Sequence, residues 1–276
     1  MPSTTNGCVK FVEHRIQDQR VLRHMKKWLN AGVLEDGKLK RSVDGTPQGG
    51  SISPLLANIY LHYVFGLWAR QWRKRKAHGD VIIVRYADDF IVGFEHRADA
   101  ERFLAELKLR FAKFNLELHP DKTRLLEFGR FAAKGRKRRG DGKPETFDFL
   151  GFTHMCSQTK QGWFQVRRKT MRNRVRMKLK AVRVELRYRL HHPVPEVGRW
   201  LAAVVRGHVN YYGVPDNFQC IRQFRMKIGW LWFRSLRRRS NKSRLDWTRM
   251  ERLMNTWIPF AHIQHPYPEQ RLCVIT

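Results

Sequence analysis

The sequence predicts an α+β fold, in which an antiparallel sheet with packed helices is followed by an all-helical region. Two apolar, β-branched runs at 81–86 and 90–94 flank the adjacent acids Asp88 and Asp89, a pattern typical of a β-hairpin. From about Thr170 onward the apolar spacing is entirely helical. The chain has 276 residues, of which 42% are hydrophobic, so it is long enough to bury a sizeable core.

The first segment with a clear periodicity is a helix from about Asp18 to Asn30. Asp18 is suited to cap its start, and Gly32 lies just beyond its end. A glycine-rich loop at 44–54 leads into a second helix, for which Ser53 is the expected N-cap and Pro54 the first helical residue. The apolar stripe of this helix consists of Leu55, Leu56, Ile59, Tyr60, Tyr63, Val64 and Leu67.

After the hairpin, the pattern predicts another amphipathic helix over about 100–114. A turn is expected at His119–Lys122, followed by a strand at 125–128. Residues 129–146 carry seven basic side chains among glycines and are predicted to form an exposed basic loop. The apolar segment 147–152 is predicted to be a strand that closes the first domain.

Four helices are expected in the last part of the chain. The later three cover about 197–212, with Gly213 as the stop, 218–238 and 247–257. The first begins near Thr170 and places one apolar stripe inward: Met171, Val175, Leu179, Val182, Leu186 and Leu190.

Charge is the strongest compositional signal. The chain has 55 Lys and Arg against 24 Asp and Glu, a formal net charge of +31. Charged helix faces are usually only solvated, but twelve basic residues against one acid over 160–189 exceed what solvation requires. The excess predicts a polyanionic partner, with RNA as the leading candidate. The candidate RNA-binding residues are Arg136, Lys137, Arg138, Arg139, Arg167, Arg168, Lys169, Arg172, Arg176, Lys180, Arg237, Arg238 and Arg239.

The four cysteines are scattered and form no Cys-x-x-Cys pair, which argues against a disulfide framework and against a zinc site. The first residues lack the basic and apolar regions of a signal peptide. No apolar run approaches the roughly 20 residues of a spanning helix. We therefore expect a reduced, cytoplasmic protein that associates with nucleic acid rather than with a membrane.

The acids Asp88 and Asp89 are the candidate catalytic and metal-binding residues. Asp is common in turns, and an isolated Asp-Asp pair would be explained by turn chemistry alone. Two carboxylates about 4 Å apart repel each other by roughly 4 kcal/mol at an effective dielectric constant of about 20. A divalent cation relieves this repulsion, and carboxylates with water are the ligands that Mg²⁺ prefers.

The loop containing Gln48, Gly49 and Gly50 precedes a helix N-terminus. Backbone N–H groups at such a position favour phosphate, and glycines let a ligand approach the backbone closely. A tight turn that needs positive φ explains these glycines equally well. The loop becomes informative because it lies some 40 residues before the Asp-Asp hairpin.

Four motifs occur in a specific order: PQGGSISPLLANIYL at 47–61, YADD at 86–89, LHPDKT at 118–123 and FLGF at 149–152. In order and spacing they resemble the bacterial group II intron reverse transcriptase/maturase family. The resemblance continues in RGHVNYYG at 206–213 and HPYPE at 265–269, which are similar to the thumb, or maturase, domain of that family.

The resemblance implies a partial right-hand polymerase palm followed by an all-α thumb/maturase domain. Residues 1–45 would be a remnant of the helical fingers and palm, 46–155 the palm, and 156–276 the thumb. The implied activity is RNA-directed DNA polymerisation with Mg²⁺ at a two-metal site. The implied partners are intron RNA, an RNA template with a DNA primer, and deoxynucleoside triphosphates.

The resemblance also assigns roles to residues. Asp88 would be a metal ligand, and Asp89 would have a supporting place beside the metals. The loop at Gln48 would pack against the incoming nucleotide. Lys122 would help to position the nucleotide or elements of the palm, and Leu150 and Gly151 would lie by the primer end. The candidate nucleotide- and primer-binding residues are Gln48, Gly49, Gly50, Tyr86, Ala87, Lys122, Leu150 and Gly151.

One departure from the family pattern affects the expected activity. A further metal-bridging Asp of the family lies on a strand that would precede 11–15, and the chain starts at Met1. We therefore expect an N-terminally truncated polymerase that lacks the first catalytic aspartate and is slow or inactive alone. Two alternatives stay open: a non-catalytic, maturase-like RNA-binding protein and a remnant of a mobile element.

Overall fold

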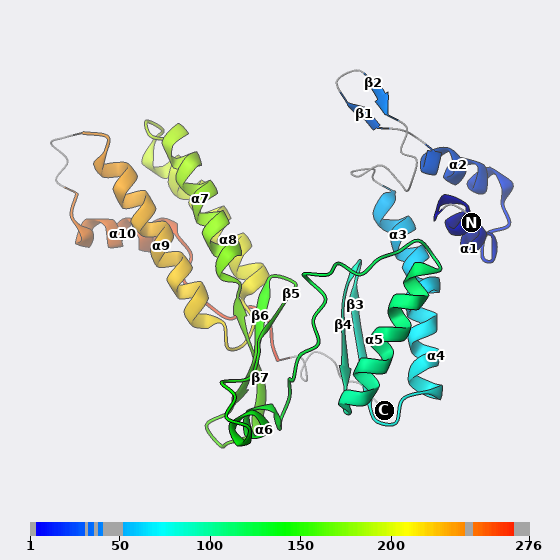
Figure 1. The fold of residues 1–276 in the computed structure, drawn as a ribbon. Coiled ribbons are helices and arrows are strands. Elements are labelled where there is room, and N and C mark those ends of the chain that lie inside the picture. Colours follow the sequence, from blue (N-terminus) through cyan, green and yellow to red (C-terminus); the bar gives the residue numbers. More distant parts are fainter. Residues whose placement is uncertain (1–3, 31–32, 36–37, 41–51, 241–244, 268–276) are drawn as a thin grey trace. The chain divides into compact units, whose positions relative to one another are not determined.

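The computed structural model describes residues 4–30, 33–35, 38–40, 52–240 and 245–267 (Figure 1). The chain divides into two compact units, Met1–Leu125 and Leu126–Thr276. Both units combine helices with small antiparallel sheets, so the predicted α+β class is confirmed. The palm and thumb boundaries expected at residues 46 and 156 stay predictions.

The first unit begins with two helices, α1 (Thr4–Glu13) and α2 (Gln19–Asn30). The cap predicted for α2 is confirmed, because the backbone N–H of Arg20 donates to Asp18 Oδ1 at 2.7 Å. The sequence did not predict α1, nor the short antiparallel pair β1 (Val33–Glu35) and β2 (Lys38–Lys40). Gly32, the expected stop of α2, lies outside the described residues.

The helix predicted after the glycine-rich loop is interrupted by one π-helical turn. It consists of α3 (Ser53–Leu61), η1 (His62–Gly66) and α4 (Leu67–Arg75). Ser53 is not its N-cap: Ile52 is, because the Ile52 carbonyl already accepts the first helical hydrogen bonds, from the N–H groups of residues 55 and 56. Pro54 is then the second helical residue, where its missing N–H leaves no hydrogen bond unmade.

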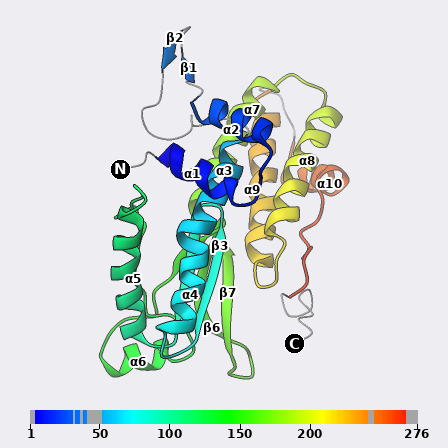
Figure 2. The ribbon, with the colours of Figure 1, turned by 90° about the vertical axis from the view of Figure 1, so that its right-hand side faces the viewer.

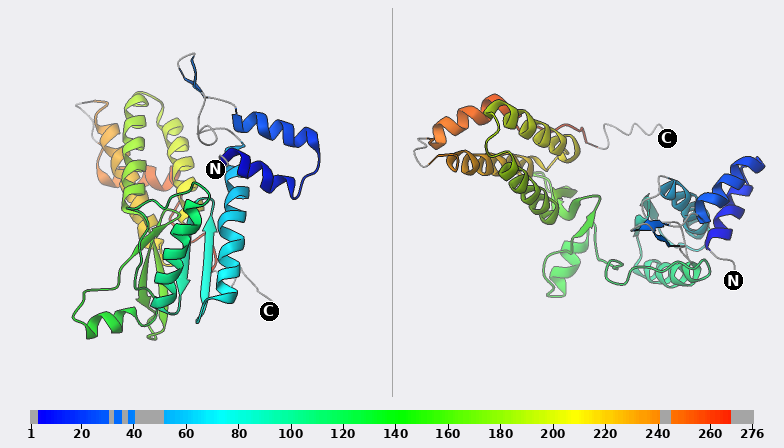
Figure 3. Two further views of the ribbon diagram at one scale, coloured as in Figure 1. Left: turned by 45° about the vertical axis from the view of Figure 1, so that its right-hand side comes forward. Right: turned by 90° about the horizontal axis from the view of Figure 1, so that it is seen from above.

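The predicted hairpin is present as β3 (Val81–Tyr86) and β4 (Asp89–Phe94), paired from Val81 with Phe94 to Tyr86 with Asp89. Helix α5 (Arg97–Ala112) follows it, as expected. Figure 3 shows this hairpin beside α4 and α5. An aromatic layer fills the space between them: Phe65, Trp72, Phe90, Phe94, Phe103 and Phe111.

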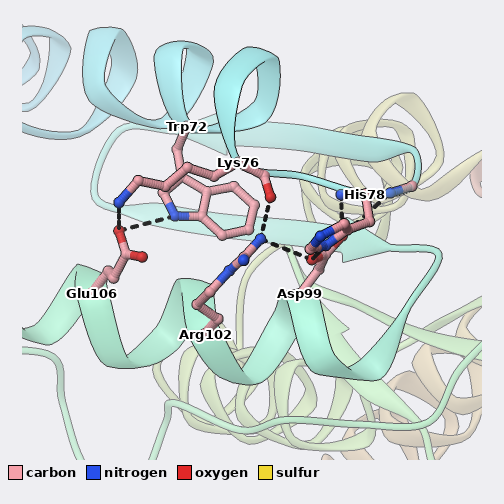
Figure 4. A network of polar contacts seen from close by, with 7 residues as sticks. Trp72, Lys76, His78, Asp99, Arg102 and Glu106 are labelled. Atoms are coloured by element: carbon pink, nitrogen blue, oxygen red, sulfur yellow. Dashed lines mark hydrogen bonds and ion pairs between the residues drawn. The ribbon is translucent and has the colours of Figure 1, made fainter.

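A polar network ties the loop after α4 to the first turns of α5 (Figure 4). Asp99 is 1% exposed, and its Oδ2 accepts from the backbone N–H groups of His78 at 2.7 Å and Gly79 at 3.3 Å. Its Oδ1 accepts from Arg102 Nη2 at 3.1 Å and lies 3.0 Å from His78 Nδ1. Arg102 also donates to the Lys76 carbonyl. This buried carboxylate therefore fixes where β3 begins.

The second unit opens with α6 (Ala132–Arg138) and a three-stranded sheet in the order β5-β6-β7. The strands are β5 (Phe147–Phe149), β6 (Phe152–Gln158) and β7 (Phe164–Thr170). Residues 147–152 thus form a strand, a turn and the start of a second strand rather than one strand. β7 was not predicted; residues up to 170 belong to the sheet, so the purely helical region begins only at Arg172.

Two expectations for residues 125–146 are wrong. Residues 125–128 form no strand; Phe128 instead packs its ring on Phe147, with centroids 4.9 Å apart. Residues 129–146 are not entirely loop, because α6 occupies their centre. Ala, Lys and Arg are strong helix formers, and this helix keeps its charges in solvent while burying Ala132.

The four predicted helices of the second unit are confirmed as α7 (Arg172–Tyr188), α8 (Val194–Tyr212), α9 (Phe218–Arg237) and α10 (Trp247–Trp257). Figure 2 shows them gathered at one end of the sheet β6–β7. Gly213 ends α8, where its N–H donates to the Val209 carbonyl at 2.7 Å. Their core includes Val182, Leu186, Leu201, Val205, Ile221, Phe224, Ile228 and Trp232.

The buried amide of Asn217 joins the sheet to this helical bundle. Its Oδ1 accepts from the Thr170 N–H at 3.0 Å, and its Nδ2 donates to Thr170 Oγ1 and to the Tyr212 carbonyl, both at 2.8 Å. Because Asn217 is fully buried, losing any of these bonds would leave a polar group unpaired. Within the described ranges, no helix is long and apolar enough to cross a lipid bilayer.

The Asp99 network makes the stability of the chain dependent on acid pH. The hydrogen bond with the His78 side chain, helped by the two backbone N–H groups, lowers the pKa of Asp99 from 3.8 to about 2. Its contribution is therefore complete above 3.8 and is lost as the pH falls toward about 2. We expect Asp99→Asn to lower the thermal midpoint near neutral pH and to reduce its fall on acidification.

The measurement is circular dichroism melting of both proteins between about pH 5 and pH 2. Glu101→Gln is the matched control, because Glu101 lies on the same helix but is exposed, and its carboxylate pairs with the exposed Arg97. Identical loss of stability in wild type and Asp99→Asn over this range would contradict the assignment.

Candidate active site

The two acids lie at a two-residue turn. Tyr86 and Asp89 are the last paired residues of the hairpin, so Ala87 and Asp88 form its tip. Ala87 has a φ of 54°, in the left-handed region that residues with a Cβ rarely adopt. The cost is about 1–2 kcal/mol, which the surrounding structure must offset. Asp88 and Asp89 are both exposed as a result of this tight turn.

Arg85 holds the turn from the inner face of the sheet. Alternation along β3 directs residues 81, 83 and 85 toward the helices. Arg85 Nη1 donates to Asn58 Oδ1 on α3 at 2.9 Å and to the Ala87 carbonyl at 2.8 Å. The Arg85 guanidinium thus links Ala87, the strained residue of the turn, to helix α3.

The opposite face of the hairpin is apolar and open. Ile82 is 66% exposed, Val84 48% and Tyr86 64%. By strand register these three side chains share a face with Asp89, the partner of Tyr86. The carboxylates therefore stand at the end of an uncovered apolar strip of the first unit.

The two carboxylates at the turn fit a divalent cation such as Mg²⁺ that is also bound by a substrate. In the described part of the chain, the carboxylate of neither Asp88 nor Asp89 has an ion-pair or hydrogen-bond partner. Mg²⁺ is usually held by one or two carboxylates together with substrate phosphates and water, not by an all-protein cage. Among the residues described, no group of three or more His, Cys, Asp or Glu could enclose a metal.

The other predicted nucleotide- and primer-binding residues are not all placed with this turn. Tyr86 and Ala87 adjoin the acids. Lys122 is exposed in the predicted turn of the first unit, where its N–H donates to the His119 carbonyl at 3.3 Å. Leu150 and Gly151 belong to the second unit. The expected nucleotide loop, Gln48, Gly49 and Gly50, lies outside the described residues.

The Leu150–Gly151 turn is strained and anchored to the end of α8. Leu150 has a φ of 48° and Gly151 a φ of 76°. Tyr211 donates to the Leu150 carbonyl at 3.0 Å, and a Cβ on Gly151 would lie 2.9 Å from the Tyr212 hydroxyl. Only glycine satisfies both the backbone angle and the space, so the turn is held in one conformation.

The predicted RNA-binding residues fall into three groups: those that bond within the chain, those partly buried on β7, and the remaining exposed ones. Arg136 and Arg139 of α6 pair with the chain's own acids, Arg136 with Glu145 and Arg139 with Glu127 and Asp141, and Arg239 donates to the His192 carbonyl. Arg167, Arg168 and Lys169 are partly buried on β7. The exposed members are Lys137, Arg138, Arg172, Arg176, Lys180, Arg237 and Arg238.

The sequence that contains the hairpin and its acids matches a known protein family. Residues 8–154, which include the hairpin and its acids, match the family described as "Reverse transcriptase (RNA-dependent DNA polymerase)". The match covers more than half of the chain. The chain belongs to the reverse transcriptase family.

Curated relatives of this reverse transcriptase-family chain include proteins of introns. It is 42% identical over 65 residues to the group II intron-encoded protein LtrA of Lactococcus lactis, covering 20% of this chain and 11% of that protein. It is 46% identical over 54 residues to an uncharacterized 91 kDa protein in the cob intron of Schizosaccharomyces pombe, covering 20% of this chain and 7% of that protein.

A longer match is with the protein YkfC of Escherichia coli, 31% identical over 147 residues. It covers 42% of this chain and 38% of YkfC. The chain therefore spans well under half the length of each of these three relatives. The predicted resemblance to group II intron proteins is confirmed at the level of the family.

Sequence reasoning missed the residues that hold the acidic turn, Arg85 and Asn58. One signal could have found Arg85: it is the only charged residue in the apolar run 81–86, at a position that alternation directs inward. Such a charge needs a partner. The partner, Asn58, lies 27 residues earlier and could not be identified without the fold.

We expect the contacts of Arg85 to stabilise the hairpin cooperatively. Arg85→Ala removes both charge-assisted hydrogen bonds and should lower the free energy of unfolding by about 2–3 kcal/mol. In a double-mutant cycle with Asn58→Ala, the coupling energy should be about 1 kcal/mol. Urea denaturation followed by circular dichroism measures both values. Strictly additive effects would show that the Arg85–Asn58 bond contributes nothing to stability.

Proposed function

We propose that this chain is an RNA-directed DNA polymerase of the group II intron type, which also binds intron RNA. Its first unit would contribute part of a polymerase palm, and the helices of its second unit a thumb with maturase character. The observation that carries this proposal is the exposed Asp-Asp turn on a hairpin within the reverse transcriptase match. The substrates would be an RNA template with a DNA primer and deoxynucleoside triphosphates.

In this proposal Asp88 and Asp89 hold Mg²⁺ together with phosphates of the bound nucleotide. The metal would supply activation of a primer hydroxyl and stabilisation of the leaving pyrophosphate. The protein's part is to present two oxygen donors in a fixed place, which the Arg85 brace and the Tyr86–Asp89 pair accomplish. Tyr86 and Ala87 would line the nucleotide and primer beside the acids, and Lys122 of the same unit would help to position the nucleotide.

A second candidate is an RNA-binding protein of maturase type without polymerase chemistry. One observation favours it: no third acid of the described chain joins Asp88 and Asp89, whereas two-metal phosphoryl transfer needs a fuller ligand set. The exposed basic residues of α7 and α9 would serve this candidate equally well.

Primer extension on an RNA template with Mg²⁺ separates the two candidates. If the chain is a polymerase, Asp88→Asn should reduce extension more than about hundredfold, because a lost metal ligand removes several kcal/mol of transition-state stabilisation. Asp89→Asn should reduce it less. Asp80→Asn is the matched control, since Asp80 is exposed beside the far end of the same hairpin.

Extension by Asp88→Asn at the wild-type rate would exclude the proposed catalytic role. Tight RNA binding by the wild type without any extension would favour the maturase-type candidate instead.

RNA binding through the exposed basic residues predicts a steep dependence on salt. Each phosphate neutralised on single-stranded RNA contributes about −0.7 to the slope of log K against log salt. Replacing Arg172, Arg176 and Lys180 with Gln should therefore make the slope about 2 units shallower. Replacing Arg136 and Arg139, which already pair with Glu145, Glu127 and Asp141, should change it less. Fluorescence anisotropy in a salt series gives the slopes, and a flat wild-type slope would contradict electrostatic binding.

A further inference from the structure

The turn between β6 and β7 presents a tryptophan to solvent. Trp163 is 74% exposed, whereas Trp232 and Trp72 are at most 2% exposed in the two cores. A large aromatic side chain is normally buried because it removes much apolar surface from water. Its exposure on a turn between regular strands suggests a ligand rather than a packing role.

The backbone of this turn is built to hold Trp163 in place. The Thr159 N–H donates to the Trp163 carbonyl at 2.8 Å, and the Trp163 N–H donates to Thr159 Oγ1 at 3.2 Å. The Gly162 N–H donates to the Thr159 carbonyl at 3.0 Å, with Gly162 at a φ of 85°. The hairpin below is paired without interruption from Phe164 to Thr170. The tryptophan is therefore presented by a rigid element.

A second exposed aromatic residue lies toward the same end of this unit. Phe131, also 74% exposed, immediately precedes α6. The thiol of Cys156 on β6 accepts from the Gly129 N–H at 3.4 Å, which holds the segment before Phe131 against the hairpin. Figures 1 and 2 show α6 and the β6–β7 turn at the end of the sheet away from α7–α10.

These aromatic residues stand in a strongly positive segment. Residues 130–169 contain eleven Lys and Arg against three acids. All three acids are engaged within the unit: Asp141 with Arg139, Glu145 with Arg136, and Asp148 with the Thr153 hydroxyl at 2.5 Å. The net charge of this segment is therefore positive. Lys160 lies in the same turn as Trp163.

This combination of chemistry fits single-stranded nucleic acid better than a lipid or an apolar protein surface. The residues next to Trp163 in the turn are Lys160, Gln161 and Gly162, so a membrane or an apolar partner would find the rings of Trp163 and Phe131 to bury among polar and basic residues. An unpaired base stacks on one ring, and its phosphates pair with cations.

We propose that Trp163 is a base-stacking residue, and that the β6–β7 turn and the segment before α6 together bind unpaired nucleotides of RNA. Phe131 provides a second stacking surface, and Lys160, Lys137 and Arg138 neutralise phosphates. The proposal rests on the RNA binding proposed above and adds a site remote in sequence from the Asp-Asp turn.

The test compares two labelled oligomers of about twelve nucleotides, an oligouridylate and an abasic ribose-phosphate chain of the same length. Trp163→Ala in the full chain should bind the oligouridylate about five- to hundredfold more weakly than wild type. Binding of the abasic oligomer should stay unchanged, because its phosphates contact cations only. Trp163→Phe should restore most of the affinity, since it keeps a ring.

Salt dependence separates stacking from charge. Trp163→Ala should leave the slope of log K against log salt unchanged, whereas Lys160→Gln should make it shallower by about 0.7. Trp28→Ala is the matched control, because Trp28 is 45% exposed on α2 of the other unit. It should bind both oligomers like wild type. Thermal melting of each variant confirms that the fold is retained.

Equal binding of the oligouridylate by folded Trp163→Ala and wild type would overturn the stacking proposal while leaving RNA binding intact. Failure of wild type to bind either oligomer would overturn RNA binding itself. Loss of binding to phosphatidylglycerol vesicles in Trp163→Ala, with unchanged RNA binding, would assign the turn to lipid and also overturn the proposal.

Discussion

The pairing of β3 with β4 is the constraint on which the candidate active site depends. Because side chains alternate along a strand, the register Tyr86 to Asp89 decides at once which residues face the helices and which face solvent. A slip of β4 by one residue would turn Asp89 toward the helices and expose the rings of Phe90 and Phe94. The aromatic core of the first unit therefore determines where Asp89 lies, although Asp89 shares the opposite face of the hairpin with Tyr86.

That core is in turn held in register by buried polar contacts at both ends of the hairpin. At the open end, Asp99 fixes the loop that leads into β3. At the closed end, Arg85 fixes the turn through Asn58 and the Ala87 carbonyl. Apolar packing alone is non-directional, so these hydrogen bonds supply the directional part of the arrangement. The hairpin can then place two exposed carboxylates, those of Asp88 and Asp89, next to each other at its turn.

Much of the fold was predictable because its elements carry local signals. The hairpin 81–94 combines β-branched alternation with turn residues, and 247–257 combines helical spacing with the cap Asp246, whose side chain accepts from the Arg249 N–H. The failures have physical causes. β7 contains three consecutive basic residues at 167–169, which break the alternation typical of a strand, and it is a strand because β6 pairs with it. Helix α6 was not predicted, because a basic segment without an apolar stripe has the sequence pattern of an exposed loop.

The candidate site could be predicted where residues with functional side chains also form a recognisable local pattern. Backbone strain in two of these motifs is a second, independent observation. Four residues other than glycine have a positive φ in the described part of the chain: Ala87, Asn115, Leu150 and Asp216. Asn and Asp adopt this conformation readily, because their side chains bond to the local backbone. Ala and Leu do not, so Ala87 and Leu150 are strained, and both lie in motifs that the sequence marked as functional.

In each case a side chain from outside the turn donates to the strained residue: Arg85 of the adjoining strand to the carbonyl of Ala87, and Tyr211 of α8 to the carbonyl of Leu150. Strain that the fold actively maintains is best understood as preorganisation, because a relaxed turn would serve packing equally well. The turns at Ala87 and Leu150 therefore have one feature in common: each is a short loop held by a hydrogen bond from a neighbouring strand or helix. This gives a physical reason, independent of the resemblance, for treating both as parts of functional sites.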